Sequence, residues 1–236
     1  MRDIKVRFTE KIQRAPTVIS FRFLLSEKIN FIPGQFLQVI FDEANRANKG
    51  LNKYLSFSSS PTKEYIEITK RISESQFSKK LLSLKNNDEI LMKLPLGNVT
   101  FLDEYKAIAF LIGGIGITPV ISIIEYICDR GLDTDVLLFY SNRRDDDIAF
   151  RENLDNWQEK NKNIKVIYTV TECVPKDKKC IFGKIDKKLI SDKKCDLSGR
   201  MIFIFGPPSM VKAMQNLCDD CGCGKENVKI ENFIGY

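Results

Sequence analysis

The segment 113–119 constrains the fold more than any other part of this sequence. It reads GGIGITP and stands directly between an apolar run at 107–112 and a helical pattern at 119–129. Glycines allow a tight turn and a close approach to a pyrophosphate, and the N–H groups of the following helix terminus then face the anion. Thr118 is expected to cap that helix, and Pro119 suits its first turn. A plain strand-to-helix turn is the alternative, although such a turn rarely needs three glycines in four positions.

Beyond about residue 103, apolar strands alternate with helices. Strands are expected at 107–112, 135–140, 164–170, 201–205 and 228–231, and helices at 119–129, 148–159 and 210–218. Continuous apolar runs are typical of strands that are covered on both faces. A βαβ series of this kind predicts a mainly parallel sheet with right-handed crossovers.

The first hundred residues follow a different pattern, with short strands separated by turns. Strands are expected at 4–12, 17–25, 36–41, 54–58, 65–71 and 89–94, with one short helix at 76–84. Several short strands at this spacing favour a small antiparallel barrel. The predicted fold therefore has two domains, a β-barrel over 1–103 and an α/β domain over 104–236.

Composition excludes several kinds of chemistry. The 236 residues include no histidine, which removes imidazole bases, Ser-His and Cys-His nucleophiles and His-ligated metals. A bound cofactor is therefore the economical source of reactivity. No apolar stretch approaches the length of a membrane span, and the start of the chain does not resemble a signal segment, so we expect a cytoplasmic protein.

The seven cysteines fit that compartment, since an odd number indicates free thiols and not a disulfide framework. Cys218, Cys221 and Cys223 lie at an expected helix end beside two glycines, with no fourth cysteine at cluster spacing. We expect structural thiols there and no metal. The net charge of +6 suits an acidic partner, whereas a solvated lysine-rich surface is the plainer interpretation. Nucleic-acid binding would rest on charge alone and is not expected.

The GGIGITP loop resembles that of the ferredoxin–NADP reductase family, and further motifs of that family follow in order along the whole chain. The resemblance implies an FAD-binding barrel and an NAD(P)-binding α/β domain. The segment 53–61, KYLSFSSSP, resembles the family's R-x-Y-S flavin motif. It implies flavin binding by Lys53, Tyr54, Leu55 and Ser56, with Ser56 beside the flavin N5. Lys53 replaces an arginine and Leu55 an aromatic residue. Without the resemblance, 56–60 could be a polar strand edge.

A second flavin segment is implied at 70–78. In the family, a serine-containing turn that opens a helix receives the diphosphate. The matching residues are Lys70, Arg71, Ser75 and Ser78. Cations and a helix N-terminus converge here within nine residues, which favours an anion. A simple helix cap is the alternative.

Three more resemblances concern the nicotinamide nucleotide. Gly113, Gly114, Gly116 and Thr118 would hold its diphosphate, and Gly206 and Pro207 match a turn beside the nicotinamide, with Phe205 in place of the family's cysteine. Glu231 and Phe233 match a carboxylate placed two residues before a ring that covers the flavin. Tyr236 would lie beyond, nearer the adenine.

Ser141, Arg143 and Arg144 follow an expected strand where the family contacts the adenosine 2′ position. Two arginines beside a serine suit a 2′-phosphate, which favours NADP over NAD. The acidic residues 145–147 follow at once and could instead cap the next helix.

The sequence thus predicts a flavoprotein that takes a hydride from NAD(P)H and passes electrons to a carrier protein such as ferredoxin or flavodoxin. Ser56, Glu231 and Phe233 are the expected catalytic residues. The alternatives are an electron-transfer subunit of an oxygenase or dihydroorotate dehydrogenase, or a nucleotide-binding regulatory subunit with little activity alone.

Overall fold

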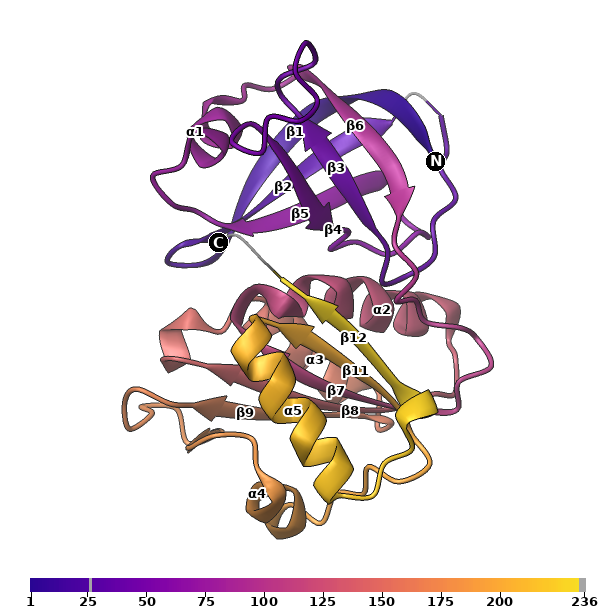
Figure 1. Cartoon of the computed structure of the whole chain (residues 1–236), viewed down its shortest axis with the longest axis vertical. Helices are drawn as coiled ribbons and strands as arrows, with labels where there is room; N and C mark the ends of the chain where they lie inside the picture. Colours follow the sequence, from indigo (N-terminus) through magenta and orange to yellow (C-terminus); the bar gives the residue numbers. More distant parts are fainter. Residues whose placement is uncertain (26, 234–236) are drawn as a thin grey trace. The chain divides into compact units, whose positions relative to one another are not determined.

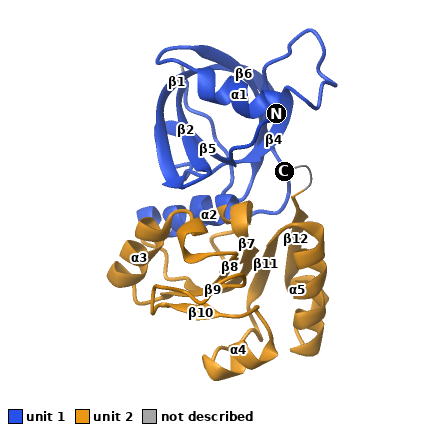
Figure 2. Ribbon diagram, turned by 90° about the vertical axis from the view of Figure 1, so that its left-hand side faces the viewer, with its two compact units in different colours: residues 1–101, 118–130 blue, residues 102–117, 131–236 orange. Residues whose placement is uncertain are grey.

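The computed structural model describes residues 1–25 and 27–233, and contacts divide the chain into two compact units (Figure 2). Unit 1 consists of residues 1–101 and 118–130, and unit 2 takes the remainder. The helix that follows the glycine-rich loop thus groups with the first unit. The domain boundary after residue 103 stays a prediction.

Unit 1 is built on an antiparallel sheet, as the spacing of short strands predicts. Its six described strands have the order β4-β3-β6-β1-β2-β5. Their bounds are β1 (Arg2–Ala15), β2 (Val18–Leu25), β3 (Phe36–Ile40), β4 (Asn52–Ser56), β5 (Tyr65–Arg71) and β6 (Glu89–Leu96). An antiparallel bridge between Phe57 and Ile68, and a bond from the Ser58 amide to the Glu67 carbonyl at 2.8 Å, join the two edge strands. The sheet therefore closes into a barrel.

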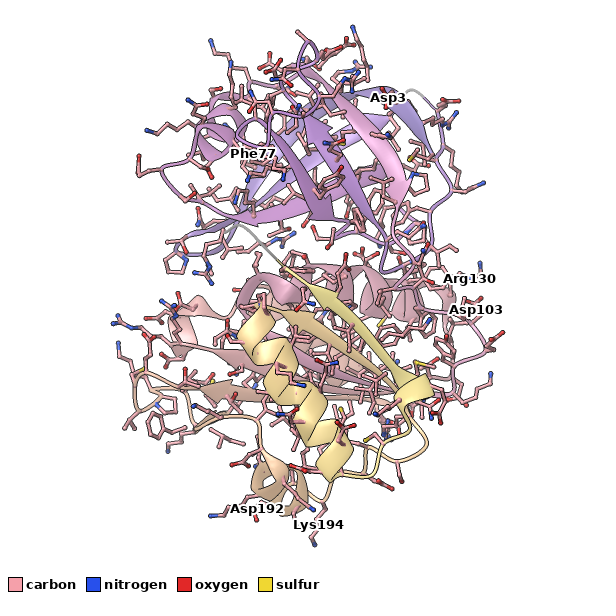
Figure 3. All side chains as sticks on the ribbon, viewed as in Figure 1. Asp3, Phe77, Asp103, Arg130, Asp192 and Lys194 are labelled. Atoms are coloured by element: carbon pink, nitrogen blue, oxygen red, sulfur yellow. The ribbon has the colours of Figure 1, made fainter. Side chains whose placement is uncertain are left out.

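The core of unit 1 follows from the alternation of its strands. Val6 and Phe8 on β1 and Phe21 and Phe23 on β2 point inward, while the residues between them are more exposed. Helix α1 (Gln76–Ser83) adds the fully buried Phe77, which is labelled in Figure 3.

Helix α2 (Ile117–Arg130) contributes two acidic side chains to unit 1. Glu125 accepts the Ser60 amide at 2.7 Å, and Asp129 pairs with Lys63 at 2.9 Å. Burial, opposed by the Ser60 bond and by Lys63, raises the pKa of Glu125. These two contacts attach residues 60–63 to α2. We refer to residues 60–63 as the 60–63 turn.

Unit 2 contains the predicted parallel sheet. Its six described strands have the order β10-β9-β8-β7-β11-β12, and each neighbouring pair runs parallel. The strands are β7 (Ala107–Gly113), β8 (Asp135–Asn142), β9 (Ile164–Val170), β10 (Cys180–Phe182), β11 (Met201–Gly206) and β12 (Val228–Asn232).

Helices cover both faces of this sheet. Helices α4 (Lys187–Asp192) and α5 (Pro208–Asp220) pack on one face against Leu111, Phe139 and Ile204; Figure 1 shows α5 lying along it. Helix α3 (Arg151–Lys160) contacts β9 from the other side, where Tyr168 donates a hydrogen bond to Asp155 at 2.8 Å. No helix in the described residues is both long and apolar enough to cross a bilayer.

Local backbone geometry corrects three sequence-based expectations. Thr118 is the second residue of α2 and not its cap, because a 3₁₀ turn over Gly114–Gly116 leads directly into the helix. Helix α3 begins at Arg151 and not near 148, because Phe150 has a left-handed backbone with φ of 59°. Asp145 does not cap α3, since its carboxylate accepts the amides of Lys176 and Asp177. Strand β10 and helix α4 were not predicted.

Candidate functional site

The first group of predicted site residues lies on β4 in unit 1. Ser56, at the end of the strand, is buried and pairs with Phe36 of β3. Leu55 packs against the barrel core. Tyr54 is 62% exposed, and its ring meets the edge of Phe36 at 5.8 Å between centroids. β4 therefore carries a buried hydroxyl and an exposed aromatic ring two positions apart.

Lys53 and Lys70 are two cations close enough to repel each other. Lys70 of β5 is only 7% exposed, and its ammonium donates to the Arg71 carbonyl at 3.2 Å. Burial first, and then the charge of Lys53, lowers the pKa of Lys70. Neither lysine makes an ion pair with any residue that the structure describes. Because a buried cation beside another cation is costly, this arrangement favours an anionic ligand.

Serine hydroxyls gather at the N-terminus of α1. Ser75 is the cap residue and accepts the Ser78 amide at 3.2 Å; a part for Ser75 in a diphosphate site stays a prediction. Ser73, which the sequence reasoning missed, bonds to the Ser75 hydroxyl at 3.1 Å and donates its amide to Ser78. A cap satisfies one amide of the first turn, and others stay open to an anion. Arg71 donates to the Thr17 hydroxyl at 3.0 Å.

In unit 2, the predicted nucleotide residues come together at the carboxyl edge of the sheet. Gly113 ends β7 and is the register partner of Ser141 on β8, while Gly206 ends β11 on the other side of β7. The chain order reverses here, because β8 and β9 lie to one side of β7 and β11 and β12 to the other. Ligands of open α/β sheets bind at such a switch point.

The glycines of this edge are required by close packing. A Cβ on Gly116 would strike the backbone carbonyl oxygen of Phe205, and one on Gly113 would strike the Met210 side chain. Gly114 has φ of +52°, and its carbonyl accepts the Tyr140 hydroxyl at 3.1 Å. Pro207 is the N-cap residue of α5. Gly113 and Gly116 are therefore fixed by close packing against α5 and β11, which keeps this strand-to-helix turn free of side chains at both positions.

Glu231 and Phe233 lie at the end of β12, beside Gly206. The Phe233 amide donates to the Gly206 carbonyl at 2.9 Å, and its ring lies 6.4 Å from that of Phe205. Burial raises the pKa of Glu231 to about 7, and its Oε2 atom has no hydrogen-bond partner among the described residues. Tyr236 lies outside the described residues.

Of the predicted 2′-phosphate residues at the same edge, Arg143 and Arg144 are exposed and Ser141 is partly buried. Arg143 pairs with Glu172 at 3.4 Å, and Arg144 is exposed. Between Ser141 and Arg143 stands Asn142, only 5% exposed, whose amide nitrogen and oxygen both lack partners in the described chain. Sequence reasoning missed Asn142 because it ended the strand at residue 140. A polar residue closing an apolar strand was the available signal.

Comparison with known families matches each half of the chain separately. Residues 5–101 match the oxidoreductase FAD-binding domain, and residues 110–216 match the oxidoreductase NAD-binding domain. The two matches together cover most of the chain, in the order that the barrel and the parallel sheet follow.

Curated relatives are distant but extend along much of the chain. NADH-cytochrome b5 reductase 1 of Mortierella alpina is 26% identical over 94% of this chain and 76% of its own length. The reductase component 1 of terephthalate 1,2-dioxygenase from Comamonas sp. is 22% identical over 98% of this chain and 69% of its own. Nitrate reductase [NADH] of Cucurbita maxima is 28% identical over 57% of this chain, and the match covers only 16% of the length of that protein.

Solved structures share the fold. The cytochrome b5 reductase domain of Ulva prolifera nitrate reductase matches with a TM-score of 0.83 and 20% identity, over 98% of this chain and 97% of that one. A ferredoxin NADP+ reductase from Neisseria gonorrhoeae with bound FAD and NADP matches with a TM-score of 0.82 and 21% identity, over 98% and 99% of the two chains. At these identities the two matches show a shared fold.

Proposed function

Since the chain belongs to the ferredoxin–NADP reductase-like family of FAD- and NAD-binding oxidoreductases, we propose that it takes a hydride from NAD(P)H onto FAD and passes electrons to a carrier protein. The observation that carries the proposal is the pair Lys53 and Lys70. These cations have no described carboxylate partner and lie on strands of the flavin-type barrel. FAD supplies the hydride acceptor and can release electrons one at a time.

In unit 1, the proposed roles follow from chemistry at each position. Lys53 and Lys70 would neutralise the FAD diphosphate, together with Arg71 and the hydroxyls of Ser75 and Ser78. Ser56 would donate its hydroxyl toward the flavin N5. The exposed Tyr54 ring offers an apolar surface beside it.

In unit 2, backbone amides of the Gly113–Gly116 segment would bind the dinucleotide diphosphate. Ser141, Arg143 and Arg144 would read the adenosine 2′ position, and two exposed guanidinium groups there support NADP as the preferred nucleotide. The buried Glu231 carboxyl would position the nicotinamide, and Phe233 would move aside to admit the ring.

For the acceptor, we propose ferredoxin or flavodoxin, in the cytoplasm. The support is electrostatic: the cationic excess of the chain falls in unit 1, because basic and acidic residues balance in unit 2. Acidic carriers are steered toward such a surface. The named relatives favour a second candidate, the reductase component of a cytochrome b5 or oxygenase system.

An absorption spectrum of the purified protein tests the central proposal. We expect a yellow flavin spectrum that bleaches under anaerobic conditions with NADPH, and more slowly with NADH. A colourless protein that cannot be reconstituted with FAD would refute the proposal and favour a regulatory subunit. Reduction of ferredoxin, flavodoxin and cytochrome b5 by the same preparation then separates the acceptors.

Two variants test the assigned residues. Lys53→Met should weaken FAD binding about tenfold or more, since a hydrogen bond to a charged group contributes about 1.5–3 kcal/mol; Lys49→Met, in an exposed loop, is the matched control. Ser56→Ala should slow flavin reduction in stopped-flow experiments while FAD stays bound. Unchanged transient kinetics would remove Ser56 from the mechanism.

A further inference from the structure

The C-terminal end of α5 places two cysteines side by side through its backbone. Gly222 has φ of +73°, the Cys223 amide donates to the Cys218 carbonyl at 2.9 Å, and the Gly222 amide donates to that of Asp219 at 3.0 Å. These bonds define a Schellman motif, in which the residue after the left-handed glycine meets the residue five positions earlier. A hydrophobic contact usually occupies that position. Here both residues are cysteines.

The two thiols are close neighbours in the cluster that packs beneath α5. A hydrogen bond joins the Cys218 and Cys223 side chains. Cys218 is 2% exposed and packs in the core beneath α5, whereas Cys223 is partly exposed at its edge. An external reagent therefore has access to Cys223 first. Within the described residues, no group of three or more Cys, Asp or Glu side chains is arranged to hold a metal.

We propose that Cys218 and Cys223 are a dithiol site that is oxidised to an intramolecular disulfide by a low-molecular-weight disulfide such as oxidised glutathione. The Cys223 thiolate attacks one glutathione sulfur, the glutathione S–S bond breaks, and the first glutathione leaves as a thiolate. The Cys218 thiolate then attacks the Cys223 sulfur of the mixed disulfide and expels the second glutathione. The two protons lost by the cysteines end on the glutathione thiols, so two thiols are oxidised and one disulfide is reduced.

The surroundings make this exchange slow at neutral pH. Burial, followed by the neighbouring Cys thiols and Asp219, raises the pKa of Cys218 to about 12. Burial also raises the pKa of Cys223, which faces Cys221, Asp196 and Asp219 as well. Since the thiolate is the nucleophile, the rate should rise about tenfold for each pH unit between pH 7 and 9. The site is independent of the flavin and nucleotide assignments.

Mass spectrometry of the whole chain tests the proposal. The protein is incubated with oxidised glutathione at pH 8.5, remaining thiols are alkylated, and the chain is cleaved on the N-terminal side of aspartate. Cleavage before Asp219 separates Cys218 from Cys223, so the proposed bridge links two peptides that a Cys221–Cys223 bridge would leave apart. We expect five alkylated thiols of the seven, and the linked pair.

Variants identify the partners. Cys221→Ser should keep the linked pair, whereas Cys218→Ser should stop at a glutathione adduct on Cys223. Cys173→Ser, in the loop before β10, is the control and should behave like the wild type. A Cys221–Cys223 bridge, loss of the bridge in Cys221→Ser, or seven alkylated thiols after prolonged incubation at pH 8.5 would each overturn the proposal.

Discussion

Replacing Glu231 with glutamine should remove a defined part of the pH dependence of folding. Burial raises the pKa of this carboxyl from 4.5 to about 7. Below pH 4.5 the carboxyl is protonated in both the folded and the unfolded chain. Between pH 4.5 and 7 the unfolded chain releases the proton while the folded chain keeps it, so the free energy of unfolding falls as the pH rises. Above pH 7 both states are ionised and the loss is complete.

The size of the effect follows from the shift. At about 1.4 kcal/mol per pKa unit, a shift from 4.5 to about 7 means that the buried carboxylate costs at most about 3.5 kcal/mol above pH 7. Glu231→Gln has no such penalty, so its stability advantage over the wild type should grow from pH 5 to pH 8. At pH 8 the variant should therefore be more stable than the wild type, although the replaced residue belongs to the proposed active site.

Urea unfolding of the cofactor-free protein, followed by circular dichroism at pH 5, 6, 7 and 8, measures this difference. When the free energy of unfolding of the variant is subtracted from that of the wild type, the contributions of other titrating groups, including Glu125, cancel. Glu226→Gln, at an exposed position two residues before β12, is the matched control. A stability difference between wild type and Glu231→Gln that stays constant from pH 5 to pH 8 would refute the reasoning.

Three further outcomes are expected. Gly116→Ala should reduce nucleotide binding and stability more than Gly131→Ala, because a Cβ on Gly116 would strike the Phe205 carbonyl. A Cβ on Gly131 meets open space, so that variant has only the cost of its left-handed backbone, with φ of +60°; equal thermal shifts would contradict this. Glu67→Gln should destabilise unit 1 by about 3 kcal/mol in urea unfolding, since this 2%-exposed carboxylate pairs with Arg14 at 2.8 Å and Arg22 at 2.7 Å. Asn142→Leu should leave the free protein at least as stable as the wild type, because the buried side-chain amide of Asn142 lacks a described partner. The same variant should bind NADPH more weakly in calorimetry. An unchanged affinity would exclude Asn142 from the site.

The sequence predicts the fold well where periodicity decides it. The apolar run of β7 and the alternation of β2 gave their strands to within a few residues. It fails where a single backbone angle decides, as at Phe150, which delays α3. It also fails for short elements such as β10, whose three residues carry too little pattern.

The candidate site divides in the same way. The glycine cradle could be predicted because Gly113, Gly114 and Gly116 are adjacent in sequence and their chemistry is local. The pairing of Lys53 with Lys70 and the unpartnered amide of Asn142 depend on which strands become neighbours and which side chains become buried. Only folding determines those environments, so a sequence pattern can name the residues without giving their charge or exposure.

The attachment of α2 to unit 1 has a consequence for synthesis on the ribosome. The 60–63 turn gains its partners Glu125 and Asp129 only after the chain has been extended through residue 130. Strand β7, at the switch point of unit 2, is synthesised after residues 60–63 and before α2. At that time β8 and β11, the strands that pair with β7, have not yet been synthesised. The first unit therefore completes its structure with an unpaired apolar strand inserted in its chain. This order of emergence makes residues 107–112 the segment of the nascent chain most in need of protection from aggregation.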